Sequence, residues 1–260
     1  MYGIALEGGG AKGAYQLGAW KALNELGIEY NGIVGTSIGT INAALMIQSD
    51  IDIAYNVWNN MGFSASKNMG GELAAKMASH EFNSRDPIGL KNEMKEVFGT
   101  DGIDITAFKN EMKKTINEKA IRESKIDFGL VTISLKQQRG LELFKEDIPE
   151  GRLSDYIVAS CCLPVFKSIE IDGDYFLDGS YYNQIPTNML IKKGYKNIIE
   201  IRLYPPKPEQ IQYSDVNIIT VYPKEYLGKT LDFSKELALK NIERGYRDTI
   251  DTFKELINNN

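Results

Sequence analysis

A serine flanked by two glycines is the feature of this sequence with the clearest chemical meaning. The pentapeptide Gly35-Thr36-Ser37-Ile38-Gly39 has the form G-x-S-x-G, follows the apolar pair Ile33-Val34 and leads into a helix-compatible run, Ile38 to Met46. Strand, tight turn and helix in this order are the context of a nucleophile elbow. Gly35 and Gly39 permit the sharp turn that lifts a hydroxyl clear of the backbone. We therefore predict that Ser37 is a nucleophile.

A serine nucleophile needs a base, and in the usual triad the base is a histidine. The chain has a single histidine, His80. In the α/β-hydrolase order the histidine follows the acid, and no histidine follows His80. Either Ser37 is not a nucleophile, or it works directly with a carboxylate. We favour the carboxylate and assign His80 to a surface or lid segment.

Two Asp-Gly pairs that lie close together in the sequence are candidates for that carboxylate. Asp172-Gly173 lies between the alternating segments Ile169 to Ile171 and Tyr175 to Leu177, which indicates a hairpin turn. Asp178-Gly179 follows the second of these strands, where a side chain can reach a site. Most Asp-Gly pairs are only turns, so position alone leaves the role of Asp178 open.

The glycine-rich run Gly8-Gly9-Gly10-Ala11-Lys12-Gly13 follows one predicted strand and opens a helix. It satisfies the dinucleotide-binding pattern G-x-G-x-x-G. That reading needs an acidic residue at the end of the second strand, where the chain has Gly35-Thr36-Ser37 instead. An oxyanion hole of backbone N–H groups at a helix start fits better. A tight turn without a ligand is the third alternative. Lys12 either contacts a phosphate headgroup or is solvated.

Composition restricts the possible partners and compartments. The net charge of −5 over 260 residues argues against a nucleic-acid partner and against capture by anionic membranes, while transient apolar contact with a membrane surface stays open. Cys161 and Cys162 are adjacent, so they are poor disulfide partners and indicate buried thiols in a reducing compartment. With neither a signal peptide nor a transmembrane run, we expect a cytoplasmic protein. There is no zinc-type cluster; an acidic calcium site stays open.

The element pattern predicts an α/β fold with a parallel sheet. Tyr2 to Leu6 and Gly32 to Gly35 read as strands, and each precedes a helix-compatible segment. Further strands are predicted over 116–120, 128–135, 141–144, 197–203 and 216–222. Helices are expected over 51–60, from Asp86 to about 98, and over 153–160. We expect one domain over residues 1–260.

Two segments have a less certain role. Residues 61–83 are irregular and rich in Gly, Ser and Met, so they suit either a mobile lid or an ordinary surface connection. The chain closes with a long amphipathic helix at about 231–257. We expect its apolar face to pack on the sheet; a membrane or partner surface is the alternative.

Taken together, the motifs resemble those of patatin-like phospholipases, in the compact form of bacterial members. The glycine run with Lys12, the Gly35–Gly39 elbow, the block Ala159 to Pro164 with Phe166, and Asp178-Gly179 come in the family's order. The resemblance covers about residues 1–205. The departure is Ser180, where the family's motif usually has glycine or alanine.

The resemblance implies a three-layer α/β/α sandwich with a mostly parallel sheet and hydrolysis of lipid acyl esters. It implies a catalytic dyad of Ser37 and Asp178, without histidine, metal or cofactor. The oxyanion hole would be formed by Gly9 and Gly10, with help from Gly8, Ala11 and Lys12. Alternatives are a small-ester esterase or lysophospholipase with the same dyad, a nucleotide-binding protein, and a catalytically silent binding module. The substrate's headgroup, the chain length and the oligomeric state stay undetermined.

Overall fold

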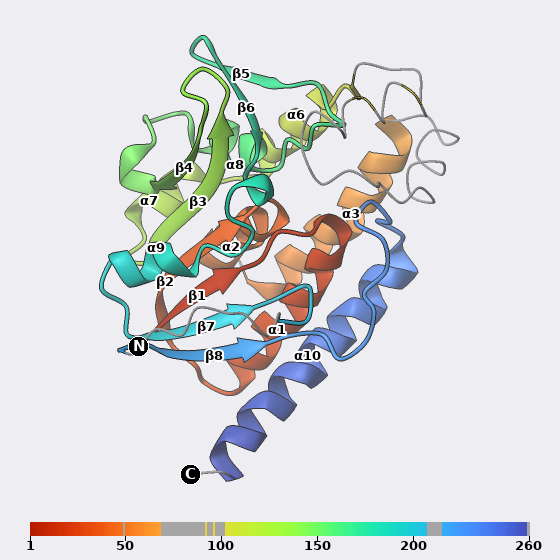
Figure 1. The fold of residues 1–260 in the computed structure, drawn as a ribbon. Helices are drawn as coiled ribbons and strands as arrows, with labels where there is room; N and C mark the ends of the chain where they lie inside the picture. The colour runs from red at the N-terminus through yellow and green to blue at the C-terminus, as the bar shows by residue number, and fades with distance from the viewer. Residues whose placement is uncertain (49, 69–91, 93–95, 97–101, 207–214, 259–260) are drawn as a thin grey trace.

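The computed structural model describes residues 1–48, 50–68, 92, 96, 102–206 and 215–258 (Figure 1). Its strands are β1 (Tyr2–Leu6), β2 (Tyr30–Thr36), β3 (Asp127–Ser134), β4 (Arg139–Phe144), β5 (Ile169–Ile171), β6 (Asp174–Asp178), β7 (Asn197–Ile201) and β8 (Asn217–Val221). Its α-helices are α1 (Ala14–Glu25), α2 (Ile38–Gln48), α3 (Ile51–Asn68), α6 (Thr106–Thr115), α7 (Glu118–Glu123), α8 (Leu153–Ser160), α9 (Thr187–Lys192) and α10 (Lys235–Asn258). Short 3-10 helices are η1 (Gly10–Gly13), η2 (Lys145–Asp147) and η3 (Gly179–Tyr181).

The strands of the described residues form one mixed sheet with a parallel centre. Its order is β5-β6-β3-β2-β1-β7-β8, and β4 also pairs with β3. Strands β3, β2, β1, β7 and β8 are parallel, whereas β4 and β6 run antiparallel to β3. The expected mostly parallel sheet is confirmed.

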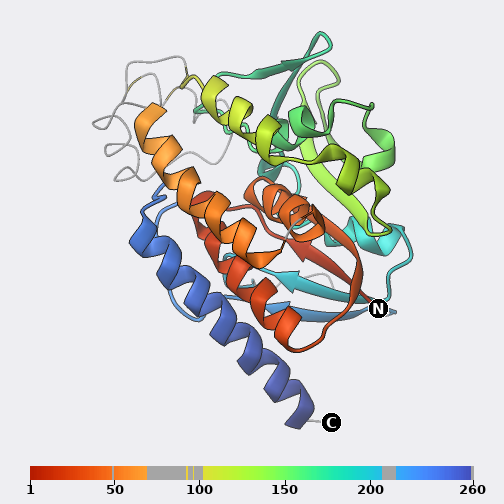
Figure 2. The ribbon, with the colours of Figure 1, turned by 180° about the vertical axis from the view of Figure 1, so that it is seen from behind.

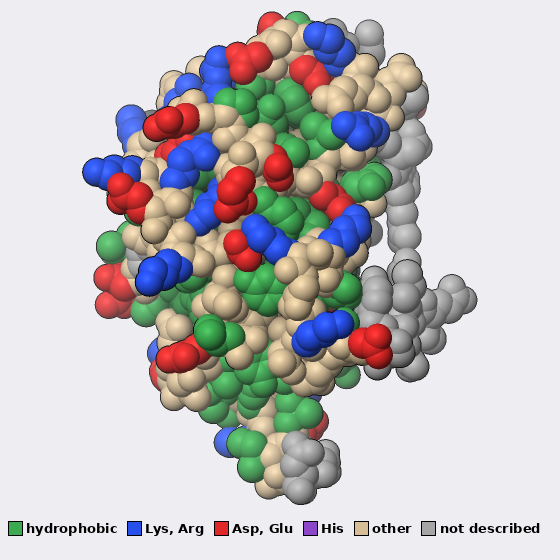
Figure 3. Space-filling model, turned by 90° about the vertical axis from the view of Figure 1, so that its left-hand side faces the viewer, with side chains coloured by type: hydrophobic (Ala, Val, Ile, Leu, Met, Phe, Trp, Pro, Cys, Tyr) green, Lys and Arg blue, Asp and Glu red, His purple; other side chains and the backbone are tan. Residues whose placement is uncertain are grey.

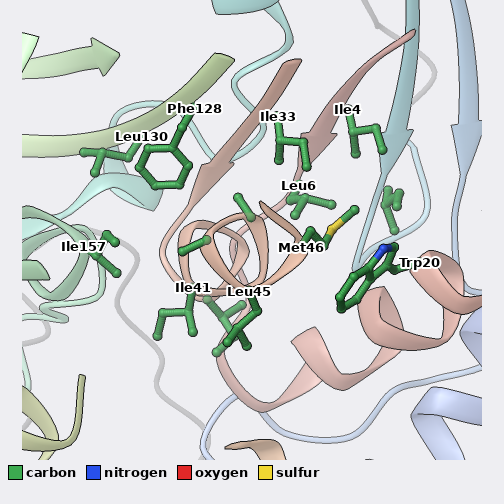
Figure 4. Close-up of a cluster of buried hydrophobic side chains, with 14 of the residues drawn as sticks. Ile4, Leu6, Trp20, Ile33, Ile41, Leu45, Met46, Phe128, Leu130 and Ile157 are labelled. Atoms are coloured by element: carbon green, nitrogen blue, oxygen red, sulfur yellow. The ribbon is translucent and has the colours of Figure 1, made fainter. Parts of the chain in front are cut away.

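Helices cover both faces of the sheet, because side chains of a strand alternate between its faces. One face presents Ile4 and Leu6 of β1, with Ile33, Phe128 and Leu130 of the neighbouring strands, to helices that include α1, α2 and α8 (Figure 4). The opposite face presents Ala5, Val34, Val131 and Ile198, which pack with Met189 and Leu190 of α9. The result is the three-layer α/β/α arrangement that the family resemblance implied.

Helix α10 packs mainly along α1 and makes only minor contact with β8 (Figure 2). The helices approach so closely because two glycines lie at their contact. A Cβ on Gly18 would overlap the carbonyl oxygen of Ile242, and a Cβ on Gly245 would overlap that of Tyr15. The prediction that this helix packs on the sheet is therefore wrong: its apolar face is used by another helix.

Two local predictions are also wrong. The predicted strand over 116–120 is instead the junction of α6 and α7, since the Asn117 side chain accepts a hydrogen bond from the Ala120 N–H (3.1 Å) and caps α7. The helix predicted over 51–60 is confirmed as part of α3, but the expectation that 61–83 is irregular is wrong for residues 61–68, because α3 continues to Asn68. The Asp172-Gly173 hairpin is confirmed. His80 and the other residues from 69 to 83 lie outside the described residues. The same is true of the helix expected from Asp86 to about 98, except for residues 92 and 96.

Acidic and basic side chains alternate with small hydrophobic areas on the face seen in Figure 3, so this side carries no large field of one sign. None of the helices in the described part of the chain combines the length and apolar character needed to cross a bilayer.

Candidate functional site

Ser37 lies in a strained turn between β2 and α2. Its φ of 54° is in the left-handed region, which non-glycine residues rarely adopt. The turn is tight enough to require both neighbouring glycines. A Cβ on Gly35 would overlap the Gly39 carbonyl, and a Cβ on Gly39 would lie 2.5 Å from the carbonyl oxygen of Leu6. This is the strand–turn–helix geometry that the G-x-S-x-G pattern predicted.

The structure brings Ser37 together with Asp178, the last residue of β6. The Ser37 hydroxyl donates to Asp178 Oδ2 at 2.6 Å. Asp178 Oδ1 accepts from the Ser180 N–H (2.8 Å), and the Asp178 N–H donates to the Cys162 carbonyl (2.8 Å). Asp178 is completely buried and Ser37 is 6% exposed. The carboxylate is thus fixed on both sides, with one oxygen directed at the serine.

The surroundings of Asp178 adjust its basicity. Burial raises the pKa of this carboxyl from 3.8 to about 6, against the opposing effect of the hydrogen bonds from Ser37 and Ser180. A carboxylate with a higher pKa accepts a proton more readily. At neutral pH Asp178 is still mostly ionised, so it can accept the proton of the Ser37 hydroxyl.

Cys161 adjoins the same pair. Burial and the charge of Asp178 raise the pKa of its thiol well above the usual value, so the thiol stays protonated and is a poor nucleophile. Both cysteines are free, as expected. Cys162 is buried, whereas the residue Cys161 keeps some exposed surface although its thiol group is buried, so the expectation of two buried residues is corrected for Cys161.

The glycine run lies beside the elbow and has two unused backbone donors. A Cβ on Gly8 would lie 3.3 Å from Ser37 Cβ. Among the residues that the structure describes, the N–H groups of Gly9 and Gly10 have no acceptor. Three other amides of the run are engaged: Gly8 donates to Gln184 O (2.9 Å), Ala11 to Thr230 O (2.7 Å) and Lys12, weakly, to Gly9 O (3.4 Å).

Lys12 is buried, being only 6% exposed, so of the two alternatives for this residue the solvated lysine is wrong. Its ammonium donates to the hydroxyls of Tyr204 (2.9 Å) and Thr230 (3.3 Å) and lies 4.3 Å from the centre of the Tyr204 ring. These contacts tie the start of the first helix to the segments after β7 and β8. Contact of Lys12 with a headgroup remains a prediction.

Sequence reasoning overlooked two hydroxyl residues behind the elbow. Ser160, the last residue of α8, accepts the Ser37 N–H at 2.9 Å, and its Oγ lies 2.9 Å from Thr40 Oγ1. Thr40 in turn donates to the Gly35 carbonyl at 2.9 Å. Only the position of Ser160, in the block Ala159 to Pro164, offered a signal, since the contact spans 123 residues of sequence.

Glu7, directly before the glycine run, was also overlooked. Its Oε2 accepts the N–H groups of Leu203 (2.5 Å) and Tyr204 (3.1 Å). Burial raises the pKa of Glu7 to about 7, against the effect of these hydrogen bonds. The carboxyl therefore links the end of β1 to the chain after β7. No set of three or more His, Cys, Asp or Glu side chains in the described residues is arranged to hold a metal ion.

Comparisons with known proteins identify the family of this chain. The family model described as patatin-like phospholipase matches residues 4–191. Human patatin-like phospholipase domain-containing protein 6 is 26% identical over 202 residues, covering 76% of this chain and 13% of the relative. Lysophospholipase nte1 of Aspergillus terreus is 28% identical over 184 residues, covering 70% and 10% respectively. The chain thus spans about a tenth of the length of these curated relatives.

Solved structures show the same fold at low identity. VipD from Legionella pneumophila aligns with a TM-score of 0.53 and 13% identity, over 98% of this chain and 67% of its own. Human GIVD cytosolic phospholipase A2, solved with a fluorophosphonate inhibitor, aligns with a TM-score of 0.51 and 11% identity, over 99% and 58%. Because the family model matches well over half of the sequence, this chain belongs to the patatin-like phospholipase family.

Proposed function

We propose that this protein hydrolyses carboxylic esters of lipids through a dyad of Ser37 and Asp178. The observation that carries the proposal is the 2.6 Å hydrogen bond from the Ser37 hydroxyl to a fully buried carboxylate. Ser37 also lies on a strained elbow, beside two backbone donors that have no acceptor among the described residues. Nucleophile, base and oxyanion donors are the parts that acyl transfer requires.

In the first step Ser37 Oγ attacks the ester carbonyl carbon while its proton passes to Asp178 Oδ2. The carbonyl oxygen becomes an oxyanion, which the N–H groups of Gly9 and Gly10 stabilise. Collapse of this intermediate breaks the bond to the alcohol, which leaves with the proton from Asp178. The serine then carries the acyl group as an ester.

In the second step Asp178 takes a proton from a water molecule that attacks the acyl-Ser37 carbonyl. The oxyanion forms again at the same amides and collapses to release the fatty acid, while the proton returns to Ser37 Oγ. Because a carboxylate is a weak base for a hydroxyl, stabilisation of the oxyanion by the glycine amides must supply much of the reduction in the activation barrier. Loss of one such donor in a serine hydrolase costs roughly 3 kcal/mol.

A lysophospholipid is the second candidate substrate. It is favoured by the similarity to lysophospholipase nte1, which covers 70% of this chain. The same dyad would act on one acyl chain instead of two. Rates on matched diacyl and monoacyl phospholipids would separate these candidates.

The test is labelling of the protein by a fluorophosphonate probe together with turnover of a short-chain ester. Ser37→Ala should abolish both labelling and turnover. Asp178→Asn should abolish turnover, since the amide cannot accept the proton. His80→Ala should have no effect, because the proposed mechanism uses no histidine.

Two variants serve as matched controls. Asp172 belongs to the neighbouring Asp-Gly pair and lies exposed in the hairpin turn, so Asp172→Asn should be active. Ser168 is exposed, so Ser168→Ala should label normally. The proposal fails if the wild type is unlabelled, or if Ser37→Ala still turns over the ester.

A further inference from the structure

We propose that Ser160 is a positioning residue that holds the Ser37 elbow in its reactive conformation. The inference rests on the proposed hydrolase function and adds a residue to the machinery of that site. Ser160 contacts the backbone nitrogen of Ser37, at 2.9 Å, and its role is to position that residue.

The hydrogen bonds around Ser160 can be satisfied in only one order. Thr40 Oγ1 donates its proton to the Gly35 carbonyl, so it can only accept from Ser160. Ser160 Oγ therefore donates to Thr40 and accepts from the Ser37 N–H. The resulting chain runs from Ser37 N–H through Ser160 and Thr40 to Gly35 C=O. It connects the nucleophile with the residue that begins the turn.

This chain supports a conformation that the backbone does not favour. Ser37 has a φ of 54°, and such strained residues persist only where the surrounding structure over-determines them. Ser160 and Thr40 are fully buried, so water cannot replace a missing partner. Loss of either hydroxyl leaves a buried polar group unpaired next to the strained residue.

The same end of α8 also holds the base. The Cys162 carbonyl, two residues after Ser160, accepts the Asp178 N–H at 2.8 Å. One short segment therefore fixes the backbone of the nucleophile through Ser160 and the backbone of the base through Cys162. A shift of Ser37 relative to this segment changes its distance to Asp178.

The experiment compares Ser160→Ala, Thr40→Val and Thr40→Ser with wild type. The readouts are the second-order rate of fluorophosphonate labelling at Ser37, kcat and KM for a short ester, the pH profile, thermal unfolding, and exchange of the Ser37 amide proton by NMR. Matched controls remove buried hydroxyls that are not part of the Ser37–Ser160–Thr40–Gly35 hydrogen-bond chain. Ser134→Ala replaces a buried serine bonded to Asp174, and Thr249→Val replaces a buried threonine that donates to Gly245 O within α10.

Ser160→Ala and Thr40→Val should lower kcat and the labelling rate together, by on the order of 10²-fold, because small misplacements of a reacting group have effects of that size. KM and the pKa of the acid limb should stay at their wild-type values, and Ser37 amide exchange should accelerate. Thr40→Ser should restore most of the rate. The controls should lose stability without losing labelling.

Wild-type labelling rates in folded Ser160→Ala and Thr40→Val would overturn the role of Ser160. If Ser160→Ala fails to fold, Thr40→Val decides by the same readouts. An unlabelled wild type would instead remove the proposed function. In that event amide exchange decides the role of Ser160 by itself: faster exchange in Ser160→Ala, but not in Ser134→Ala, supports the proposed positioning, and unchanged exchange overturns it.

Discussion

Thr36 and Asp178 are paired with consecutive residues of β3, Val131 and Thr132. Strand β4 occupies the opposite side of β3 along this stretch, so β2 and β6 lie on the same edge of β3. They run in opposite directions and end facing each other. Ser37 follows the end of β2 and Asp178 is the end of β6, so the sheet itself brings the two side chains together.

The raised pKa of Asp178 predicts an acid limb in the pH profile of activity. The carboxylate must be ionised to accept the serine proton, and its pKa is about 6. We expect kcat/KM for a neutral ester to fall roughly tenfold for each pH unit below about 6. Measurement of kcat/KM between pH 4.5 and 8 checks this. Activity that stays level down to pH 5 would contradict it.

Glu7 predicts a pH dependence of stability. Burial raises its pKa from 4.5 to about 7, so its contribution to the free energy of unfolding is complete below pH 4.5 and is lost as pH rises to about 7. Glu7→Gln removes this titration. Relative to wild type, the variant should gain on the order of 3 kcal/mol between pH 4.5 and 7. Denaturant unfolding at both pH values measures the difference, and a constant difference would refute the prediction.

Gly10 should be required for a reason beyond its backbone conformation. Gly10 and Gly173 both have positive φ, 59° and 76°, so alanine at either position costs about 1–2 kcal/mol. At Gly10 the new Cβ would also overlap the Thr230 carbonyl, whereas nothing lies within 4 Å at Gly173. Alanine keeps the backbone N–H, but relief of this overlap must move it away from the oxyanion, so we expect Gly10→Ala to lower kcat by roughly 10²–10³-fold, the size of a lost oxyanion donor. Gly173→Ala is the control and should keep near wild-type kcat for the same ester.

The contact of α1 with α10 should reverse the usual effect of replacing glycine in a helix. Alanine normally stabilises a helix interior by about 1 kcal/mol relative to glycine. At Gly18 and Gly245 the Cβ would overlap carbonyl oxygens of the other helix, so Gly18→Ala and Gly245→Ala should destabilise by about 1–3 kcal/mol or more. Chemical denaturation measures this, with exposed Glu255→Ala on α10 as control. Any stabilisation by either glycine variant would show that the helices do not meet at these residues.

Features that depend on neighbouring residues could be predicted from the sequence. The elbow from Gly35 to Gly39 and the turn at Asp172-Gly173 are each formed by a few neighbouring residues. Their glycines permit the tight backbone conformations that these turns require. The strands near Tyr2 to Leu6 and Gly32 to Gly35, and the helices that follow them, were likewise predicted from local apolar patterns. Asp178 was selected as a candidate base because it ends a strand, and the family resemblance strengthened that choice.

Other features were decided by the tertiary structure. The hydrogen bonds of Ser160 with Ser37 and of Glu7 with Leu203 join residues 123 and 196 positions apart, so no local pattern predicts them. The amphipathic pattern of α10 predicted a buried face. That this face packs on α1 depended on the close approach of the two helices at Gly18 and Gly245. The sequence by itself determined which residues could form the nucleophile, base and oxyanion donors. Only the packing of distant segments decided their distances, burial and pKa values, because these quantities depend on neighbours that are remote in sequence.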